Sequence, residues 1–120
     1  MRGNIWHRSY NKYSAEKVEY HGEKFDSKAE FHYYLLLADR QKKGEIRDLQ
    51  RQVTFELQPP FRDSKGRAIR AIKYIADFVY YDVDTGERHI IDVKGIRTDA
   101  YKIKAKMMAY QGNEIEEVRL

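Results

Sequence analysis

Residues 69–94 (IRAIKYIADFVYYDVDTGERHIIDVK) contain two strand-forming segments joined by a short run of turn-forming residues. Residues 69–81 and 88–94 are rich in Ile, Val, Tyr and Phe, the side chains that strands favour. The turn includes Gly86, which adopts a positive φ without steric cost. This region therefore predicts two neighbouring antiparallel strands.

Three charged residues, Asp77, Asp92 and Lys94, occur within these mostly apolar strands. Asp92 and Lys94 are two residues apart, so they share a face of their strand. With a four-residue loop, Asp77 lies directly opposite Asp92. Facing carboxylates at that spacing repel each other and raise one pKa, and a divalent cation between them removes the repulsion. The three residues therefore suggest a site.

The pairing register depends on the length of the loop. A four-residue loop over residues 83–86 pairs Asp82 with Glu87 and brings Asp77 opposite Asp92. A three-residue turn with a glycine bulge shifts the register by one and sends the two aspartates to opposite faces. The alternative to a site is a pair of strand-end aspartates and a lysine that face water.

The length of 120 residues suits one compact domain, predicted over residues 18–120 behind an N-terminal arm of residues 1–17. The arm alternates basic and aromatic residues, which fits either contact with a phosphate backbone or a frayed terminus. The chain has no Cys, no long apolar run and no secretory signal, so we expect a cytoplasmic protein without a membrane span. Its net charge of +4 mildly favours binding to polyanions, but an ordinary basic protein has a similar balance of positive and negative charges.

A first helix is predicted over residues 27–43, ending at Gly44. Ser27-x-x-Glu30 has the spacing of a capping box, which accounts for Glu30 structurally. Helical projection also places Glu30 on the face expected to pack on a sheet, together with Tyr33, Tyr34, Leu37 and Ala38. Glu30 is therefore either a cap or a carboxylate that reaches a site on the sheet.

Between this helix and the central hairpin, residues 45–57 predict a half-buried strand with Val53, Phe55 and Leu57 on one face. A turn follows at residues 63–66. The surrounding cluster of positive charge fits a solvated tip or a phosphate contact; it consists of Arg62, Lys65, Arg67, Arg70 and Lys73.

A second helix is predicted over about residues 98–111, capped by Thr98 and Asp99, with an apolar stripe of Ala100, Ile103, Met107 and Tyr110. Lys104 projects near the middle of that face, so it either extends to the edge or points into the site. Residues 115–120 predict a last short strand. The order of helix, three strands, helix and strand indicates an α/β or α+β layered domain.

Other chemistries find little support. The chain lacks a P-loop and an HExxH motif, and its four His have no zinc-ligand spacing. Asp82-x-Asp84-x-Gly86 resembles a calcium loop weakly, but Val93 occupies the position of the bidentate Glu, so a turn is the better interpretation.

In this order along the chain, the residues resemble the PD-(D/E)XK nuclease superfamily. More closely, residues 25–30 (FDSKAE) with residues 92–101 (DVKGIRTDAY) are similar to a small phage-encoded branch. Members of that branch are uncharacterised or described as endonucleases and Holliday-junction resolvases. The similarity covers about residues 18–112, and Ala76 replaces the Pro of the superfamily name.

The resemblance implies a restriction-endonuclease-like core: a central mixed sheet of about four strands flanked by helices, in the order α-β-β-β-α-β. It implies that Asp77, Asp92, Glu30 and the backbone carbonyl of Val93 hold Mg²⁺ or Mn²⁺. Lys94 would orient or activate the attacking water and stabilise charge at the phosphorus. The residues predicted to contact DNA are Lys104, by the resemblance, together with Lys102, Arg97, Arg70 and Lys73.

Physical chemistry supports the same assignment, because phosphodiester hydrolysis needs hydroxide at neutral pH and a counter-charge for the developing oxyanion. We therefore expect a metal-dependent endodeoxyribonuclease of phage DNA recombination, replication or packaging, acting in the bacterial cytoplasm. The alternatives are a non-catalytic nucleic-acid-binding module and a structural phage protein whose acids cap strands. If the substrate is a branched junction, its two-fold character implies a homodimer.

Overall fold

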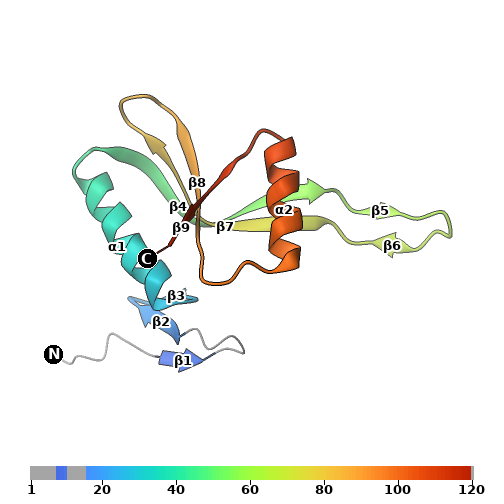
Figure 1. The fold of residues 1–120 in the computed structure, drawn as a ribbon, viewed down its shortest axis with the longest axis horizontal. Helices are drawn as coiled ribbons and strands as arrows, with labels where there is room; N and C mark the ends of the chain where they lie inside the picture. The colour runs from blue at the N-terminus through green and yellow to red at the C-terminus, as the bar shows by residue number, and fades with distance from the viewer. Residues whose placement is uncertain (1–7, 11–15, 120) are drawn as a thin grey trace.

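A computed structural model describes residues 8–10 and 16–119 of the chain. The protein is α+β, with a mixed four-stranded sheet in the order β4 (Ile46–Gln58), β7 (Ile72–Asp82), β8 (Arg88–Val93) and β9 (Ile115–Val118). The first three strands are antiparallel neighbours, and β9 runs parallel to β8. The expected mixed sheet flanked by two helices is confirmed (Figure 1).

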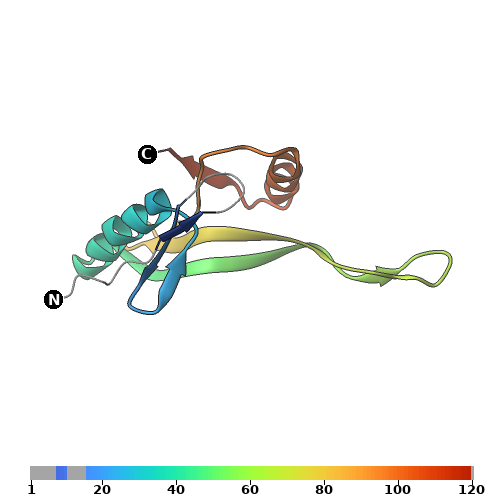
Figure 2. The same ribbon diagram turned by 90° about the horizontal axis from the view of Figure 1, so that it is seen from below.

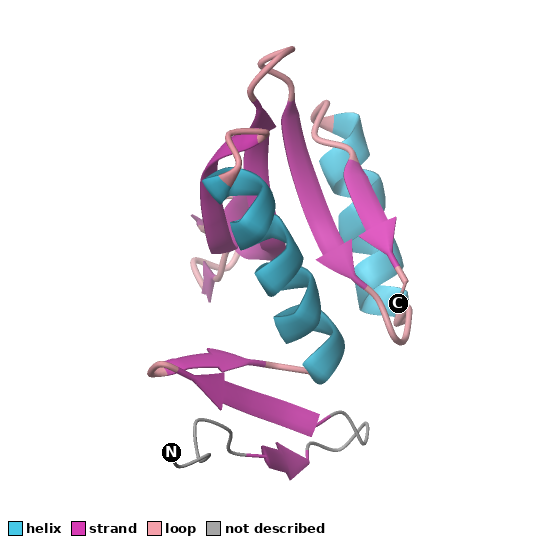
Figure 3. Cartoon of the chain, turned by 90° about the vertical axis from the view of Figure 1, so that its left-hand side faces the viewer, coloured by secondary structure: helices cyan, strands magenta, loops and turns pink. Residues whose placement is uncertain are grey.

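The helices α1 (Lys28–Lys42) and α2 (Asp99–Tyr110) cover opposite faces of this sheet (Figure 3). Phe78 packs in a cluster with Leu37 of α1, whereas its neighbour Val79 packs in a cluster with Met108 of α2. Successive residues of a strand point to opposite faces, so the two clusters are separate cores on the two sides of one sheet. Neither helix in the described part of the chain is long and apolar enough to cross a membrane.

Both helix starts follow the predicted capping chemistry. The Ser27 hydroxyl accepts the N–H of Glu30, and the Thr98 hydroxyl accepts the N–H of Tyr101, each at 3.1 Å. Gly44 has φ 81°, the left-handed conformation in which glycine ends a helix. The predicted inner face of α1 is also confirmed, because Glu30 and Leu37 are buried along it.

The predicted apolar stripe of α2 is right only for Met107, which packs against the core. Ile103 is 61% exposed and Tyr110 is 92% exposed, whereas Tyr101 and Met108 are the buried residues. The helix is rotated because Tyr101 packs on Tyr74 and its hydroxyl donates to Glu117 of β9. Both contacts join residues that are distant in the sequence, so the pattern within the helix does not reveal them.

The structure adds two parts to the predicted order of elements. A three-stranded sheet precedes α1 and consists of β1 (Arg8–Tyr10), β2 (Glu16–Tyr20) and β3 (Glu23–Phe25). The rest of the predicted N-terminal arm, residues 1–7 and 11–15, lies outside the described residues.

The second addition is a ribbon of two short strands, β5 (Phe61–Arg62) and β6 (Ala68–Ile69), which continues β4 and β7 beyond the body of the protein (Figure 1). Seen from below, the ribbon projects well past both helices (Figure 2). We call residues 58–73 the arm.

The register of β7 and β8 is the one that a four-residue loop produces. The N–H of Asp82 donates to the carbonyl of Glu87 at 2.9 Å, and the ladder runs from Tyr81 opposite Arg88 to Phe78 opposite Ile91. The three-residue turn is therefore excluded. Extended by one residue, this register brings Asp77 opposite Asp92.

Strand β4 is irregular at two points, one near the end of α1, where the Leu49 N–H donates to Gln41, and one near its start, where Gln52 donates to Glu30. Asp48 and Gln52 have φ values of 54° and 53°, in the left-handed region that side-chain-bearing residues rarely adopt. A register shift between Arg47 and Gln50 surrounds the first of them. Backbone in this conformation turns a side chain away from the regular alternation of a strand, which matters for Gln52 below.

Candidate active site

A cavity of about 700 Å³ lies between the start of α1, strands β7 and β8, and α2. The four residues predicted to be catalytic all line it, and so do two of the predicted DNA contacts. These residues are Glu30, Asp77, Asp92, Lys94, Lys73 and Lys104. The structure therefore brings together charged groups from four elements that span residues 30–104.

Asp77 occupies the point at which the β7–β8 ladder ends. Its Oδ2 accepts the backbone N–H of Val93 at 2.7 Å, so a side chain takes over where strand pairing stops. Burial and, after it, the charge of nearby Asp92 raise the pKa of Asp77 to about 7, although the Val93 N–H opposes the shift. The Val93 backbone thus reaches the site through its N–H, and its predicted role as a carbonyl ligand stays a prediction.

Asp92 is 6% exposed and has a partner on each oxygen. Its Oδ1 lies 3.0 Å from the Lys94 ammonium, and its Oδ2 accepts the Tyr74 hydroxyl in a short hydrogen bond. Burial, followed by the hydrogen bond to Asp92, raises the pKa of Tyr74 well above its ordinary value, so this phenol stays a donor. The Lys94 ammonium also lies 3.6 Å from the centroid of the Tyr101 ring, a cation–π contact.

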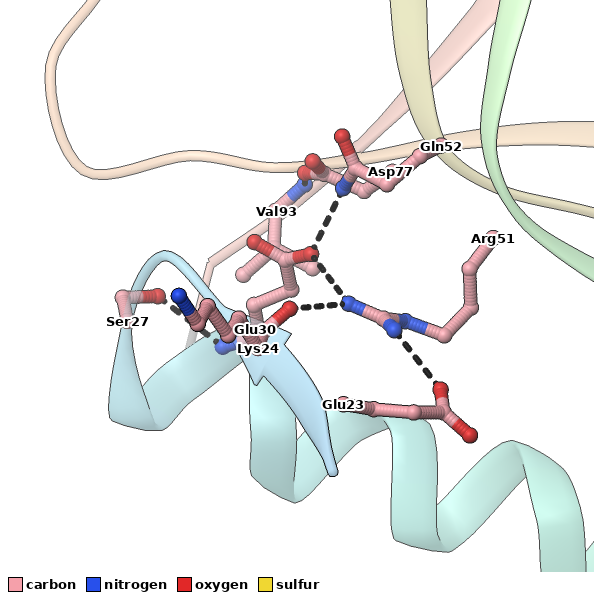
Figure 4. A network of polar contacts seen from close by, with 8 residues as sticks. All are labelled: Glu23, Lys24, Ser27, Glu30, Arg51, Gln52, Asp77 and Val93. Atoms are coloured by element: carbon pink, nitrogen blue, oxygen red, sulfur yellow. Dashed lines mark hydrogen bonds and ion pairs between the residues drawn. The ribbon is translucent and has the colours of Figure 1, made fainter. Parts of the chain in front are cut away.

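Glu30 reaches the site from the first turn of α1 (Figure 4). Its backbone N–H donates to Ser27, but its carboxylate points to the sheet, where Oε2 accepts the Gln52 amide at 2.9 Å. Burial raises the pKa of Glu30 to about 8, with repulsion from Asp77 as the next cause. The backbone N–H of Glu30 therefore takes part in the helix cap. Its carboxylate has the second predicted role, because it reaches toward the site.

Arg51 holds this corner of the site together (Figure 4). Its guanidinium donates to Glu23 and to the Lys24 carbonyl at 2.7 Å each, lies 3.8 Å from Glu30, and stacks 3.7 Å from the Phe25 ring centroid. Its Nε is buried without a hydrogen-bond partner among the described residues. Arg51 thus links the β2–β3 hairpin to β4 beside the acidic cavity. Its positive charge partly offsets the rise in the pKa of Glu30 that burial causes.

Strand β9 supports Lys94 and Tyr101 from outside the lining of the cavity. The Lys94 N–H donates to the Val118 carbonyl at 2.9 Å, and the Tyr101 hydroxyl donates to Glu117 at 2.8 Å. Arg97, predicted to contact DNA, lies 3.3 Å from the same Glu117 carboxylate. These contacts fix the backbone of Lys94 and the ring on which its ammonium rests.

The remaining predicted DNA contacts are distributed differently. Lys73 and Lys104 line the cavity, whereas Lys102 and Arg97 are exposed outside its lining and Arg70 lies on the arm. Sequence reasoning gave no role to Gln52, Tyr74 or Arg51. Only Tyr74 carried a local signal, because it precedes Asp77 in the same apolar strand.

The cavity offers oxygen ligands for a hard cation. Among residues 8–10 and 16–119, no three His, Cys, Asp or Glu side chains are placed together as a metal-binding group. Asp77 nevertheless interacts electrostatically with both Glu30 and Asp92, and two of the three carboxyl groups have raised pKa values. Carboxylates crowded in a partly dry cavity suit Mg²⁺ or Mn²⁺, because either ion would remove the repulsion between them.

The structure thus defines an α+β protein with a cleft that is lined by lysines and by four acidic residues, Asp26, Glu30, Asp77 and Asp92. The chain belongs to the family described as "Protein of unknown function (DUF1064)", whose sequence model matches residues 10–120. Searches of curated proteins and of solved structures returned no match.

Proposed function

We propose that this protein is a metal-dependent endodeoxyribonuclease of the PD-(D/E)XK type with a restriction-endonuclease-like core. The observation that carries the proposal is the convergence of Glu30, Asp77, Asp92 and Lys94 on one cavity of about 700 Å³. Burial raises the pKa values of Glu30 and Asp77, which lowers stability at neutral pH, so the clustering of these carboxylates with Asp92 is hard to explain by folding stability alone. As part of this proposal, the protein acts on phage DNA in the cytoplasm of a bacterial cell.

Each side chain has a distinct task in phosphodiester hydrolysis. Lys94 is held by Asp92 and by the Tyr101 ring at the cavity wall, where its ammonium can donate to a phosphate oxygen and stabilise the charge that develops there. Tyr74 fixes the orientation of Asp92 by donating to it. The Val93 N–H holds one oxygen of Asp77 in place.

Asp77, Asp92 and Glu30 would together hold Mg²⁺ or Mn²⁺, which supplies Lewis-acid stabilisation and lowers the pKa of water at the reaction centre. Gln52 positions Glu30 for this purpose through its amide. Lys73 and Lys104, at the rim of the same cavity, supply positive charge for the flanking phosphates.

The test is a set of labelled DNA substrates (duplex, nicked duplex, flap, four-way junction and single strand) incubated with Mg²⁺ or Mn²⁺. We expect cleavage by the unaltered protein, and loss of cleavage with retained DNA binding for Asp77→Asn, Asp92→Asn and Lys94→Ala. Asp84→Asn removes the same charge from the exposed turn and serves as the matched control, with unchanged cleavage. Cleavage that persists in EDTA, or in Asp92→Asn, would contradict the proposal.

The second candidate function is a nucleic-acid-binding module without catalysis. The observation that favours it is the placement of four basic residues of the arm outside the lining of the acidic cavity: Arg62, Lys65, Arg67 and Arg70. A pure binder gives the same DNA affinity with and without Mg²⁺ and no product on any of the substrates. Calorimetric titration with Mn²⁺ separates the two, because a pure binder has no site for the ion.

A further inference from the structure

The arm is a direct extension of the strand that carries Asp77. Strand β7 runs without interruption from Ile72 to Asp82, and the ribbon of β5 and β6 leads away from its first residue. Figures 1 and 2 show the ribbon projecting into solvent, clear of both helices. A molecule that contacts the arm is therefore connected to the acidic cavity through one continuous strand, β7.

The arm also carries the net charge of the protein. Residues 58–73 contain five Lys or Arg and one acidic residue, a net charge of +4, which equals the net charge of the whole chain. The other residues together are neutral. An even distribution of this charge would attract polyanions weakly everywhere, whereas its concentration on one projecting ribbon specifies where the polyanion binds.

Of these five cations, Lys73 lines the acidic cavity, and two of the other four have no internal role. Arg67 pairs with Asp63 at 2.7 Å and Arg62 donates to the Gly66 carbonyl at 2.8 Å, so both stabilise the turn of the ribbon. The side chains of Lys65 and Arg70 are exposed and make no ion pair or hydrogen bond within residues 8–10 and 16–119. They are free to bind an external anion.

The reach of the arm matches the repeat of duplex DNA. Eleven residues separate Asp77 from Gly66 at the tip, which at about 3.3 Å per residue is a distance of up to about 36 Å. One turn of B-DNA is about 34–36 Å long. Arg70, seven residues from Asp77, lies up to about 23 Å away by the same rule.

We propose that the arm binds the phosphate backbone of a DNA duplex that leads away from the cavity, with Lys65 and Arg70 contacting phosphates up to one helical turn from the site. This inference rests on the proposed function for the identity of the polyanion. It adds that the substrate has a double-stranded segment on the arm side, long enough to reach the tip. The protein therefore distinguishes substrates by the length of that segment.

The proposal is tested by DNA binding in EDTA, where no cleavage occurs, using fluorescently labelled duplexes of about 8, 12 and 24 base pairs. We compare the unaltered protein with the double variant Lys65→Gln/Arg70→Gln. The matched control is Lys42→Gln/Lys43→Gln, which removes the same charge from the exposed end of α1. Melting temperatures are measured first. The arm variant is expected to match the unaltered protein, because the Lys65 and Arg70 side chains make no ion pair or hydrogen bond with the described residues, and the control is expected to lie close to both, because it loses only the exposed ion pair of Lys43 with Asp39.

The unaltered protein is expected to bind the longer duplexes about tenfold more tightly than the shortest one. The arm variant loses this advantage, and its plot of log Kd against log salt concentration becomes shallower by about 2, one phosphate contact per removed charge. The control variant keeps the preference for longer duplexes and the salt dependence of the unaltered protein. The arm proposal is overturned if the two double variants weaken binding equally, or if the arm variant retains the preference for long duplexes.

Two further results separate this inference from the nuclease proposal. Arm-dependent binding without cleavage in Mg²⁺ supports the arm and contradicts the nuclease. Light scattering compares the mass of the arm variant with that of the unaltered protein. If the variant has the smaller mass and unchanged DNA binding, the arm contacts a second copy of the chain and the arm proposal is overturned.

Discussion

The raised carboxyl pKa values predict that the protein without metal becomes less stable as the pH rises. The pKa of Asp77 increases from 3.8 to about 7 on folding, and that of Glu30 increases from 4.5 to about 8. Between these limits the folded state retains protons that the unfolded state has released. The contribution to stability is therefore greatest below about pH 4, declines between pH 4 and 8, and is fully lost above the folded-state pKa values.

The magnitude is taken from the shift of Asp77 alone, because repulsion from Asp77 is one cause of the Glu30 shift and the two shifts are therefore not independent. Each pKa unit corresponds to about 1.4 kcal/mol, so a shift of about three units is worth up to about 4 kcal/mol. For a domain of this size 1 kcal/mol changes Tm by about 4 °C, which gives a decrease of roughly 8–16 °C between pH 4 and pH 8.

The assay is thermal unfolding from pH 4 to pH 8.5, with and without Mg²⁺, for the unaltered protein, Asp77→Asn and the exposed control Asp84→Asn. Without metal at high pH we expect Asp77→Asn to be more stable than the unaltered protein by about 2–4 kcal/mol, because its carboxamide keeps an acceptor for the Val93 N–H and carries no charge. Mg²⁺ should close that gap by stabilising only proteins that retain Asp77. If the three proteins show parallel pH profiles, or Mg²⁺ changes none of them, the carboxylates do not repel each other as described.

Three further predictions concern the fold and are checked by urea unfolding. Asp48→Gly should raise the free energy of unfolding by about 0.5–1 kcal/mol, because glycine adopts the left-handed φ of 54° without strain, and Asp48→Val should lower it. Met108→Ala should lower it by about 2–5 kcal/mol and Tyr110→Ala by less than about 0.5 kcal/mol, and equal effects would refute the observed rotation of α2. Arg51→Met should lower it by about 2 kcal/mol, because Glu23 and the Lys24 carbonyl lose their donor; no change would show that the guanidinium contacts are not formed in solution.

The sequence predicts those parts of the site that follow from local chemistry. The turn residues predict a hairpin with a three-residue or a four-residue loop, and the structure has the four-residue loop, whose register brings Asp77 opposite Asp92. The caps at Ser27 and Thr98 depend on residues three positions apart, so they too are visible in the sequence.

The parts that the sequence does not reveal depend on contacts between distant residues. Gln52 alternates with apolar neighbours as a surface residue should, and only its left-handed backbone and the approach of α1 bring its amide to Glu30. Tyr74 and Asp92 are 18 residues apart and meet only because of the strand register. The apolar residues of α2 occur around most of its circumference, so its buried side is decided by tertiary contacts such as that of Tyr101 with Glu117.

The position of β9 in the chain has a consequence for synthesis. Residues 115–118 are synthesised after the acids on α1, β7 and β8. Until that strand is added beside β8, Lys94 lacks the carbonyl of Val118 and Tyr101 lacks the carboxylate of Glu117. A chain that lacks β9 would thus carry every acid of the cavity while the backbone of Lys94 and the ring beneath its ammonium are less firmly held.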